Sequence, residues 1–449
     1  MISKLESFFA KVLPSPFTLS IGLTLLTLLL SICFGDYNNA NSTFFSTMNA
    51  WQSGLWNQDL LVFGYQMMLI LVLGHVLVLS KPMNALLELV SNSATSNTKA
   101  IILISASTML MGFFNWGLGL IFGAILARKI GEKSERENLG INYPLIGALG
   151  YSGMMIWHGG ISGSAPLKAS ETGHLHSIMK EYPEGFPSEV STVETIFSSS
   201  NLIIFSILLI SVPIIFSRLK HSGRSKTIPK LLSKSVSNSE EKMSHPFEIT
   251  PLLNWIFGGL LLICFSVVYL EDLLELDITP NMLNFFMLGL GIVLHKSIKN
   301  YLLSLSEAIK GASGILIQFP LYFGIIGVMR DSGLALDFAQ FFISISNETT
   351  LPIFTFISSG IVNIFVPSGG GQWAIQGPIA MESAAQLGVP IPKIIMALSY
   401  GDQVTNMLQP FWALPLLAIT KLKASDIFPF TFILFIIGSF IFIAGLLIF

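Results

Sequence analysis

The stretch Asn363-Ile-Phe-Val-Pro-Ser-Gly-Gly-Gly-Gln-Trp373 interrupts a long apolar run with three adjacent glycines, a proline and several polar side chains. Each glycine costs a helix about 1 kcal/mol relative to alanine, and glycine lets the backbone approach another group closely. A glycine run can also serve helix packing alone, but the neighbouring Pro367, Asn363 and Ser368 favour an unwound binding segment. Unwinding exposes a helix N-terminus that suits a carboxylate and carbonyl oxygens that suit Na⁺.

A weaker version of this stretch lies in the first part of the chain. Asn115-Trp-Gly-Leu-Gly119 also interrupts an apolar run, and both asparagines precede a proline, Pro144 or Pro392, by 29 positions. Internal similarity of this kind is typical of transporters built from two repeats. Chance matching between apolar segments is the alternative explanation. Polar residues follow each break, in 157–166 and in 400–412.

The composition excludes a soluble enzyme. The 449 residues are 52% hydrophobic and only 11% charged, whereas soluble domains carry about 25% charged residues. A net charge of −2 argues against a nucleic-acid partner. Cys33 and Cys264 both lie in apolar runs, where a buried thiol is favoured over a disulfide or a metal ligand. We therefore expect an all-α polytopic protein of the lipid bilayer without a cofactor.

The sequence contains nine apolar stretches that approach the length of about 20 residues needed to cross a bilayer. They begin near Phe17, Ala100, Pro144, Val193, Pro251, Pro280, Leu351, Pro392 and Phe428. Two further stretches, 60–80 and 315–329, are each followed by a weaker apolar segment, so each is either a crossing or half of a re-entrant hairpin. Basic residues mark cytoplasmic loops, and they gather on one side only if both stretches are hairpins. With 60–80 as a crossing, the basic cluster at 128–136 would lie outside.

Nine full crossings and two hairpins place the N-terminus in the cytoplasm and the C-terminus in the periplasm. The first repeat (1–217) is expected to hold a hairpin at about 59–95 and a broken helix at about 99–128. A cytoplasmic linker (218–250) and one additional span (251–270) follow. The second repeat (271–449) is expected to hold a hairpin at about 312–346 and a broken helix at about 350–386. Because a single span separates the repeats, they should be inverted, as alternating access requires.

Asp402 is the main candidate for a coupling residue, because it falls about ten residues into the span that begins near Pro392. An ionised, unpaired carboxylate at that depth costs at least about 2.5 kcal/mol. This cost favours cation coupling, by protonation or as a Na⁺ ligand, over a structural hydrogen bond to unwound backbone. His158 is less specific, since a lone histidine in an apolar segment is usually a packing residue.

The residues that we predict to bind substrate or ion are Asn115, Trp116, Gly117, Gly119, His158, Ser162, Ser164, Gln318, Asn363, Ser368, Gly369, Gly370, Gly371, Gln372, Gln376, Asp402, Gln403, Asn406 and Gln409. The only metal expected is Na⁺, near Asn115, Asn363 and Asp402. The tryptophans that adjoin the breaks either wall a pocket for a short alkyl chain or simply pack: Trp116, Trp157, Trp373 and Trp412.

These motifs resemble those of the bacterial short-chain fatty acid transporter family, of the acetoacetate/butyrate permease type. The resemblance covers almost the whole chain and is most specific in Pro367-Ser-Gly-Gly-Gly-Gln-Trp373 and Gln409-Pro-Phe-Trp-Ala-Leu-Pro415. It implies uptake of small monocarboxylates such as butyrate, acetate or acetoacetate across the bacterial inner membrane. The plan is also similar to that of the wider ion-transporter superfamily of inverted-repeat carriers with hairpins, many of which are coupled to Na⁺.

Two other functions stay open at this point. A passive channel for the same acids would share the polar lining but would show no concentrative uptake. An intramembrane hydrolase would use His158 as a base for Ser162 or Ser164, although no carboxylate motif accompanies them. The choice between Na⁺ and H⁺, the preferred chain length, the direction of flux and the formation of a homo-oligomer are also open.

Overall fold

The computed structural model describes residues 16–37, 42–178, 186–219, 250–275, 280–409 and 411–449. Every regular element among these residues is a helix, so the all-helical class predicted from the sequence is confirmed. The predicted linker, 218–250, lies almost entirely outside the described residues, as do the N-terminal Lys4 and Lys11.

The first part of the chain begins with a long helix and continues through several shorter ones. Its elements are α2 (Pro16–Phe34), α3 (Thr43–Leu55), α4 (Gln58–Leu79), α5 (Lys81–Asn92), α6 (Asn97–Phe114), α7 (Trp116–Glu137), α8 (Tyr143–Gly150), the 3₁₀ turns η1 (Ser152–Met155) and η2 (Trp157–Gly159), α9 (Ser164–Ser170), α10 (His174–Ile178) and α11 (Ser199–Arg218).

The second part follows a similar order, with a longer central helix. Its elements are α13 (Pro251–Val268), α14 (Leu270–Glu275), α15 (Pro280–His295), α16 (Ile298–Asp331), α17 (Leu334–Ser344), α18 (Leu351–Phe365), α19 (Gly369–Leu387), α20 (Ile391–Thr405), α21 (Leu414–Thr420) and α22 (Ala424–Ile448).

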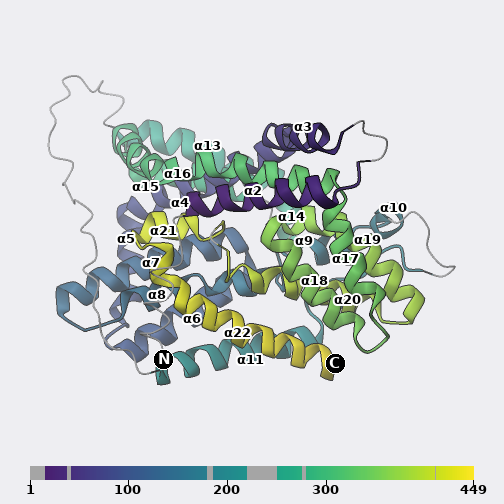
Figure 1. Cartoon of the computed structure of the whole chain (residues 1–449). Helices are drawn as coiled ribbons and strands as arrows, with labels where there is room; N and C mark the ends of the chain where they lie inside the picture. The colour runs from purple at the N-terminus through teal and green to yellow at the C-terminus, as the bar shows by residue number, and fades with distance from the viewer. Residues whose placement is uncertain (1–15, 38–41, 179–185, 220–249, 276–279, 410) are drawn as a thin grey trace.

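The helices form two packed layers (Figure 1). In one layer, α16 contacts α2, α3 and α4, while α13 and α15 pack beside each other and α15 contacts α4. The other layer contains the two broken helices, α6–α7 and α18–α19, together with α8, α20, α11 and α22. Contacts of α7 with α4 and of α21 with α16 join the layers. The site described below lies within the second layer.

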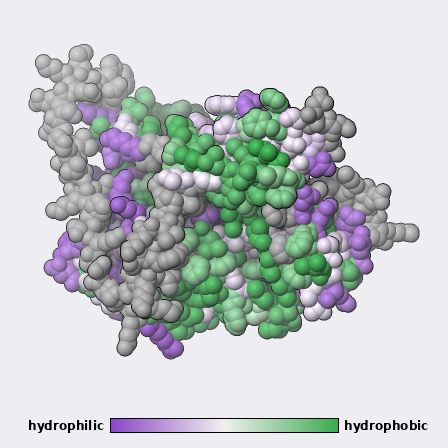
Figure 2. Space-filling model, viewed as in Figure 1, coloured by the Kyte–Doolittle hydropathy of each residue, from purple (hydrophilic) through white to green (hydrophobic). Residues whose placement is uncertain are grey.

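The surface supports a membrane location. Figure 2 shows mainly hydrophobic residues across the middle of the visible face, with hydrophilic residues towards its sides. Large apolar side chains point outwards from several helices, and α13 alone exposes Trp255, Ile256 and Val267. In water such a surface would favour aggregation, whereas lipid chains can cover it. Several apolar helices therefore make this a multi-pass membrane protein.

The helix lengths differ from the nine expected crossings. In the described chain, five helices have both the length and the hydropathy for a crossing: α4, α6, α11, α13 and α22. The stretch near Pro144 forms only the eight residues of α8 before two 3₁₀ turns. The span expected near Val193 begins at Ser199.

The two expected hairpins correspond to pairs of consecutive helices. The first, α4 and α5, is divided at Ser80, and α4 is long enough by itself to cross a membrane. The second, α16 and α17, is divided after Asp331, but α16 runs for 34 residues and continues through Pro320. The described chain therefore has no helix boundary at the predicted start of the second hairpin near 312, and re-entry of either pair stays a prediction.

The basic cluster at 128–136 lies inside α7 rather than in a loop, and two of its members are buried. Arg128 is 5% exposed and donates from its guanidinium to Ile419 O, near the end of α21. Lys133 is 4% exposed, and its Nζ donates to Asn92 O at 2.7 Å and Ser91 O at 3.4 Å, at the end of α5. Cations suit the unpaired carbonyls at helix C-termini. These two side chains therefore fasten α5 and α21 to α7.

Replacement of Lys133 tests this fastening. We expect Lys133→Met to lower the thermal midpoint of the purified protein and to cost about 1–3 kcal/mol, because buried carbonyls at the end of α5 lose their donor. As a control, Lys310→Met removes an exposed lysine paired with Glu307 and should change stability by less than about 0.5 kcal/mol. Equal midpoints for the two variants would refute the fastening role.

Candidate functional site

The first break is closed by local hydrogen bonds. Asn115 ends α6 and begins α7, and its Oδ1 accepts from Leu118 N at 3.0 Å. The backbone N–H of Trp116 donates to Ser162 Oγ at 2.9 Å. Ser162 belongs to the segment that follows η2, and Ile161 N also donates to Phe113 O. The 156–163 segment therefore lies against this break.

The second break separates α18 from α19 by three residues, 366–368. Ser368 begins α19, and its Oγ accepts from Gly371 N at 3.3 Å. The next residue, Gly369, has no room for a side chain: a Cβ there would lie 2.7 Å from Trp157 Cη2 and 2.8 Å from His158 Cε1. The glycine therefore lets the start of α19 touch the segment that covers the first break.

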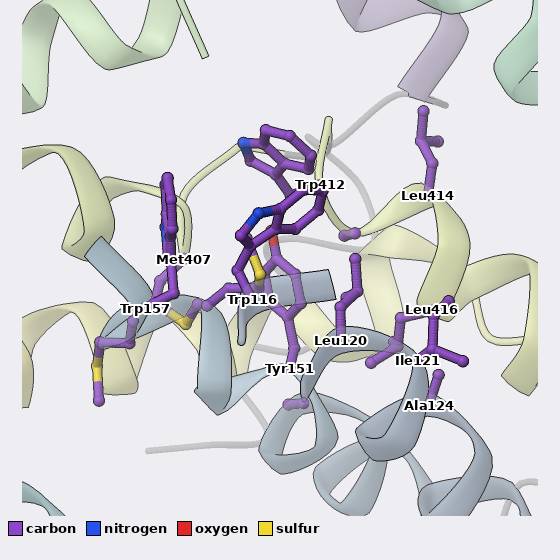
Figure 3. Close-up of a cluster of buried hydrophobic side chains, with 14 of the residues drawn as sticks. Trp116, Leu120, Ile121, Ala124, Tyr151, Trp157, Met407, Trp412, Leu414 and Leu416 are labelled. Carbon is purple, nitrogen blue, oxygen red and sulfur yellow. The ribbon is translucent and has the colours of Figure 1, made fainter. Parts of the chain in front are cut away.

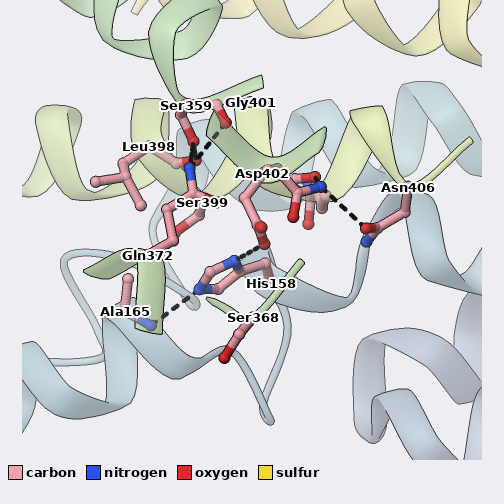
Figure 4. Close-up of polar contacts among 12 residues, drawn as sticks. His158, Ala165, Ser359, Ser368, Gln372, Leu398, Ser399, Gly401, Asp402 and Asn406 are labelled. Atoms are coloured by element: carbon pink, nitrogen blue, oxygen red, sulfur yellow. Dashed lines mark hydrogen bonds and ion pairs between the residues drawn. The ribbon is translucent and has the colours of Figure 1, made fainter. Parts of the chain in front are cut away.

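The two halves of the chain meet at a buried pair, His158 and Asp402 (Figure 4). His158 Nδ1 bonds to Asp402 Oδ2, and their side chains are 0% and 1% exposed. The other ring nitrogen, Nε2, accepts from the backbone N–H of Ala165 at 3.0 Å. An acceptor nitrogen carries no proton, so the ring proton is on Nδ1 and histidine is neutral. The histidine therefore adds no positive charge to the pair.

A network of buried amides surrounds this pair. Asn363 Nδ2 donates to Asp402 O at 2.7 Å, Thr405 Oγ1 at 2.9 Å and Asn406 Oδ1 at 3.1 Å. Gln409 Nε2 donates to the same Asn406 Oδ1 at 3.2 Å, and Asn406 Nδ2 donates to Met154 O. These bonds bring the ends of α18 and α20 together.

A second group of amides holds α19 against α18. Gln372 Nε2 donates to Ser359 O, Ser359 Oγ and Gln376 Oε1, at 2.8, 2.6 and 2.7 Å. Ser359 Oγ in turn donates to Leu398 O on α20. Across the site, Gln403 Oε1 accepts from Gly159 N at 2.9 Å. All of these side chains are buried, so polar contacts connect three helices in the protein interior.

Aromatic side chains border the network (Figure 3). Trp116 lies between Trp157 and Trp412, with ring centroids 6.2 and 5.1 Å away, and Trp157 stacks on His158 at 4.5 Å. Trp373, which we grouped with them from the sequence, lies elsewhere: its Nε1 donates to Nε2 of His174 at 3.1 Å. Three of the four tryptophans therefore gather beside the buried pair.

The remaining predicted residues have other surroundings. A Cβ on Gly119 would lie 2.6 Å from Gly112 Cα, so Gly119 lets α7 pass close to α6, and Gly117 faces Ile70 and Leu283. Ser164 begins α9 near Gly370. Gln318, on α16, is 8% exposed and has no hydrogen-bond partner for its Oε1. Its neighbour Phe319 stacks on Phe411, beside Trp412.

Asn201 is a structural member of the site that the sequence reasoning missed. Its Nδ2 donates to Gly159 O at 2.8 Å and its Oδ1 accepts from Tyr400 Oη at 2.9 Å. An asparagine in the first turn of the apolar helix α11 was the available signal. Asn201 links the 157–159 turn to α20.

Two small cavities border the network. One, of about 10 Å³, is lined by Gln403, Asn201 and Gly159. The other, of about 20 Å³, is lined by Gln409, Tyr151 and Thr431. A space of about 10–15 Å³ holds a single water molecule, so neither cavity holds a short carboxylic acid in this conformation.

A buried polar site between two broken helices, in a multi-pass apolar fold, defines a membrane transport protein. The chain belongs to the family described as short chain fatty acid transporter, whose model matches residues 1–449. A relative from Escherichia coli (strain K12) is 35% identical over 450 residues and covers 98% of each chain; one from Haemophilus influenzae is 35% identical over 460 residues and covers 99% of each. Both carry provisional names as short-chain fatty acid transporters.

Two solved transporter structures are similar at lower levels. The Neisseria gonorrhoeae antimetabolite efflux pump MtrF is 16% identical with a TM-score of 0.44, and covers 100% of this chain and 97% of its own. The Alcanivorax borkumensis YdaH transporter is 12% identical with a TM-score of 0.45, and covers 97% of both chains. Likeness at these TM-scores supports no conclusion about the present site.

Replacement of Gly369 tests the contact between the two breaks. We expect Gly369→Ala to lower the thermal midpoint and to cost about 1–3 kcal/mol, because Trp157 or His158 must move to admit the methyl group. Gly370→Ala is the matched control, since the nearest atom to its Cβ is Ser164 Cβ at 4.0 Å. It should leave the midpoint unchanged or raise it. Equal losses in both variants would contradict the contact.

Proposed function

We propose that the protein is a secondary transporter that carries short-chain monocarboxylates, of the butyrate, acetate and acetoacetate class, across the bacterial inner membrane with a coupling cation. The observation that carries this proposal is the buried pair of His158 and Asp402, enclosed between two broken helices. Family membership and the names of the two relatives support the substrate class.

The carboxylate group of the substrate fits the start of α19. The first N–H groups of a helix have no partner within the helix and carry the positive end of its dipole. Gly369 and Gly370 supply the first two N–H groups of α19, whereas Gly371 N donates to Ser368 Oγ. Trp157 lies against Gly369. The cluster of Trp116, Trp157 and Trp412 supplies an apolar wall for a short alkyl chain.

Alternating access is the mechanism that this arrangement favours. The bordering cavities are too small for the substrate, so loading requires movement between the segments that meet at Gly369. We infer that α4–α5 and α16–α17 are the re-entrant hairpins of two inverted repeats, with the N-terminus in the cytoplasm and the C-terminus in the periplasm. Cysteine accessibility at Lys81 and Asp331, measured from each side of the membrane, tests this orientation.

The sequence motifs offer an intramembrane hydrolase no carboxylate partner for His158, and the structure corrects this point, because Asp402 bonds to His158 Nδ1. The hydrogen bonds of the serine and of the other ring nitrogen still argue against a hydrolase. Ser162 Oγ accepts from Trp116 N, and His158 Nε2 accepts from Ala165 N. Both hydrogen bonds go to the backbone, whereas a nucleophile and its base need a bond to each other. A passive channel is the remaining alternative, and it predicts no accumulation against a gradient. Labelled butyrate in liposomes, with Na⁺ and pH gradients imposed separately, distinguishes the channel from the transporter.

Asp402→Asn tests the coupling role. We expect this variant to lose gradient-driven accumulation of labelled butyrate while it retains exchange of labelled for unlabelled butyrate, because the amide keeps the shape but removes the charge. Asp331→Asn is the control, since Asp331 is partly exposed and pairs with the neighbouring Arg330. Normal accumulation by Asp402→Asn would reject the coupling assignment. Counterflow absent from the wild-type protein would reject transport itself.

A further inference from the structure

The charge of the buried pair requires compensation. The ring proton of His158 is donated to Asp402, and Ala165 N–H occupies the other ring nitrogen, so the histidine adds no positive charge. A carboxylate at 1% exposure loses its hydration, and this loss costs several kcal/mol unless a cation lies close. Among the described residues, the ion pair of Asp402 is with His158. A cation from solution would balance the remaining charge.

Three amide oxygens near this charge are buried without a hydrogen-bond partner: Asn363 Oδ1, Gln372 Oε1 and Gln409 Oε1. Most buried polar groups in proteins are paired, so an unpaired buried oxygen calls for a partner such as a bound ion or a water molecule. All three residues are at most 5% exposed. Oxygens of this kind are acceptors only, which suits a cation and opposes a carboxylate.

The direction of these oxygens is set by the amide nitrogens. Asn363 Nδ2 faces three acceptors on and after α20, so a flipped amide would place two oxygens against each other. Gln372 Nε2 likewise faces Ser359 O and Gln376 Oε1. Gln409 Nε2 faces Asn406 Oδ1, the same oxygen that accepts from Asn363. The unpaired oxygens are therefore a consequence of the network and not of an arbitrary amide assignment.

The backbone adds to the same negative potential. Asn363 lies in the last turn of α18, whose final carbonyls carry the negative end of the helix dipole. Gln409 approaches this end, because its Nε2 lies 3.4 Å from Asn363 O. In broken-helix transporters, such C-terminal carbonyls are ligands for Na⁺. The end of α18, Asn363 and Gln409 thus lie together at the second break, where Asn363 Nδ2 also bonds to the backbone of Asp402.

We propose that Asn363 and Gln409, assisted by Gln372, form a binding site for one Na⁺ at the C-terminal end of α18, with Asp402 as its counter-charge. This site deepens the proposed function. Binding of Na⁺ is argued from the structure alone, whereas its role as the coupling ion rests on the proposed transport function. Protonation of Asp402 would also remove its charge, but it would leave the amide oxygens of Asn363, Gln372 and Gln409 without a partner. A hard monovalent ion with oxygen ligands would meet both needs.

Ion-dependent stability of the full-length protein in lipid nanodiscs tests the site without transport. The thermal midpoint is measured by tryptophan fluorescence as NaCl replaces choline chloride or KCl at constant ionic strength. We expect a saturable rise with Na⁺ that neither choline nor K⁺ reproduces. We expect Gln409→Met, which keeps the side-chain length but removes the oxygen, to raise the half-saturating Na⁺ concentration by about tenfold or more. Gln372→Met gives the same test if Gln409→Met does not fold.

The control is Gln386→Met, which removes an exposed glutamine of α19 that bonds to Glu382. It should keep the wild-type half-saturation. Equal shifts with Na⁺, K⁺ and choline, or unchanged half-saturation in both site variants, would overturn the proposal. Butyrate counterflow without Na⁺-dependent stabilisation rejects this ion site and leaves the transporter standing. Stabilisation without counterflow supports the ion site and rejects the proposed substrate.

Discussion

Burial of one carboxylate governs the arrangement of the second layer. Asp402 has a neutral histidine as its partner, and that histidine is held in one tautomer by a backbone N–H of α9. Removing the carboxylate from water is tolerable only if the surrounding groups are fixed and oriented. The amides of Asn363, Asn406 and Gln409 provide that order, and they join the end of α18 to the end of α20.

The two broken helices differ in how they satisfy their ends. At the first break, Asn115 caps α7 with its own side chain and Ser162 accepts the next N–H, so the polar groups are paired locally. At the second, Asn363 turns its nitrogen towards α20 and leaves its oxygen without a partner. Ser368 caps α19 much as Asn115 caps α7, so the two breaks differ in the unpaired oxygen of Asn363 and not in their caps.

The helical class and both breaks could be predicted from the sequence, because hydrophobic length and the glycine and asparagine content are local properties. The His158–Asp402 bond could not, since it joins residues 244 positions apart. Helix lengths were also predicted poorly. Pro320 did not end α16, because tertiary packing on α2, α3 and α4 outweighs the local cost of a proline. Trp373 adjoins the break in sequence, yet it lies one turn further along α19 and bonds to His174, a contact between residues 199 positions apart that the local sequence does not reveal.

The buried ends of Arg128 and Lys133 connect folding with insertion. Basic residues beside a span bias its orientation as the chain enters the bilayer, and in the finished protein these two also close the carbonyl ends of α21 and α5. The same basic residues thus carry the charge pattern that the topology prediction uses and also hold two helices in place. A neutral replacement would change that charge pattern and loosen α5 or α21 at once.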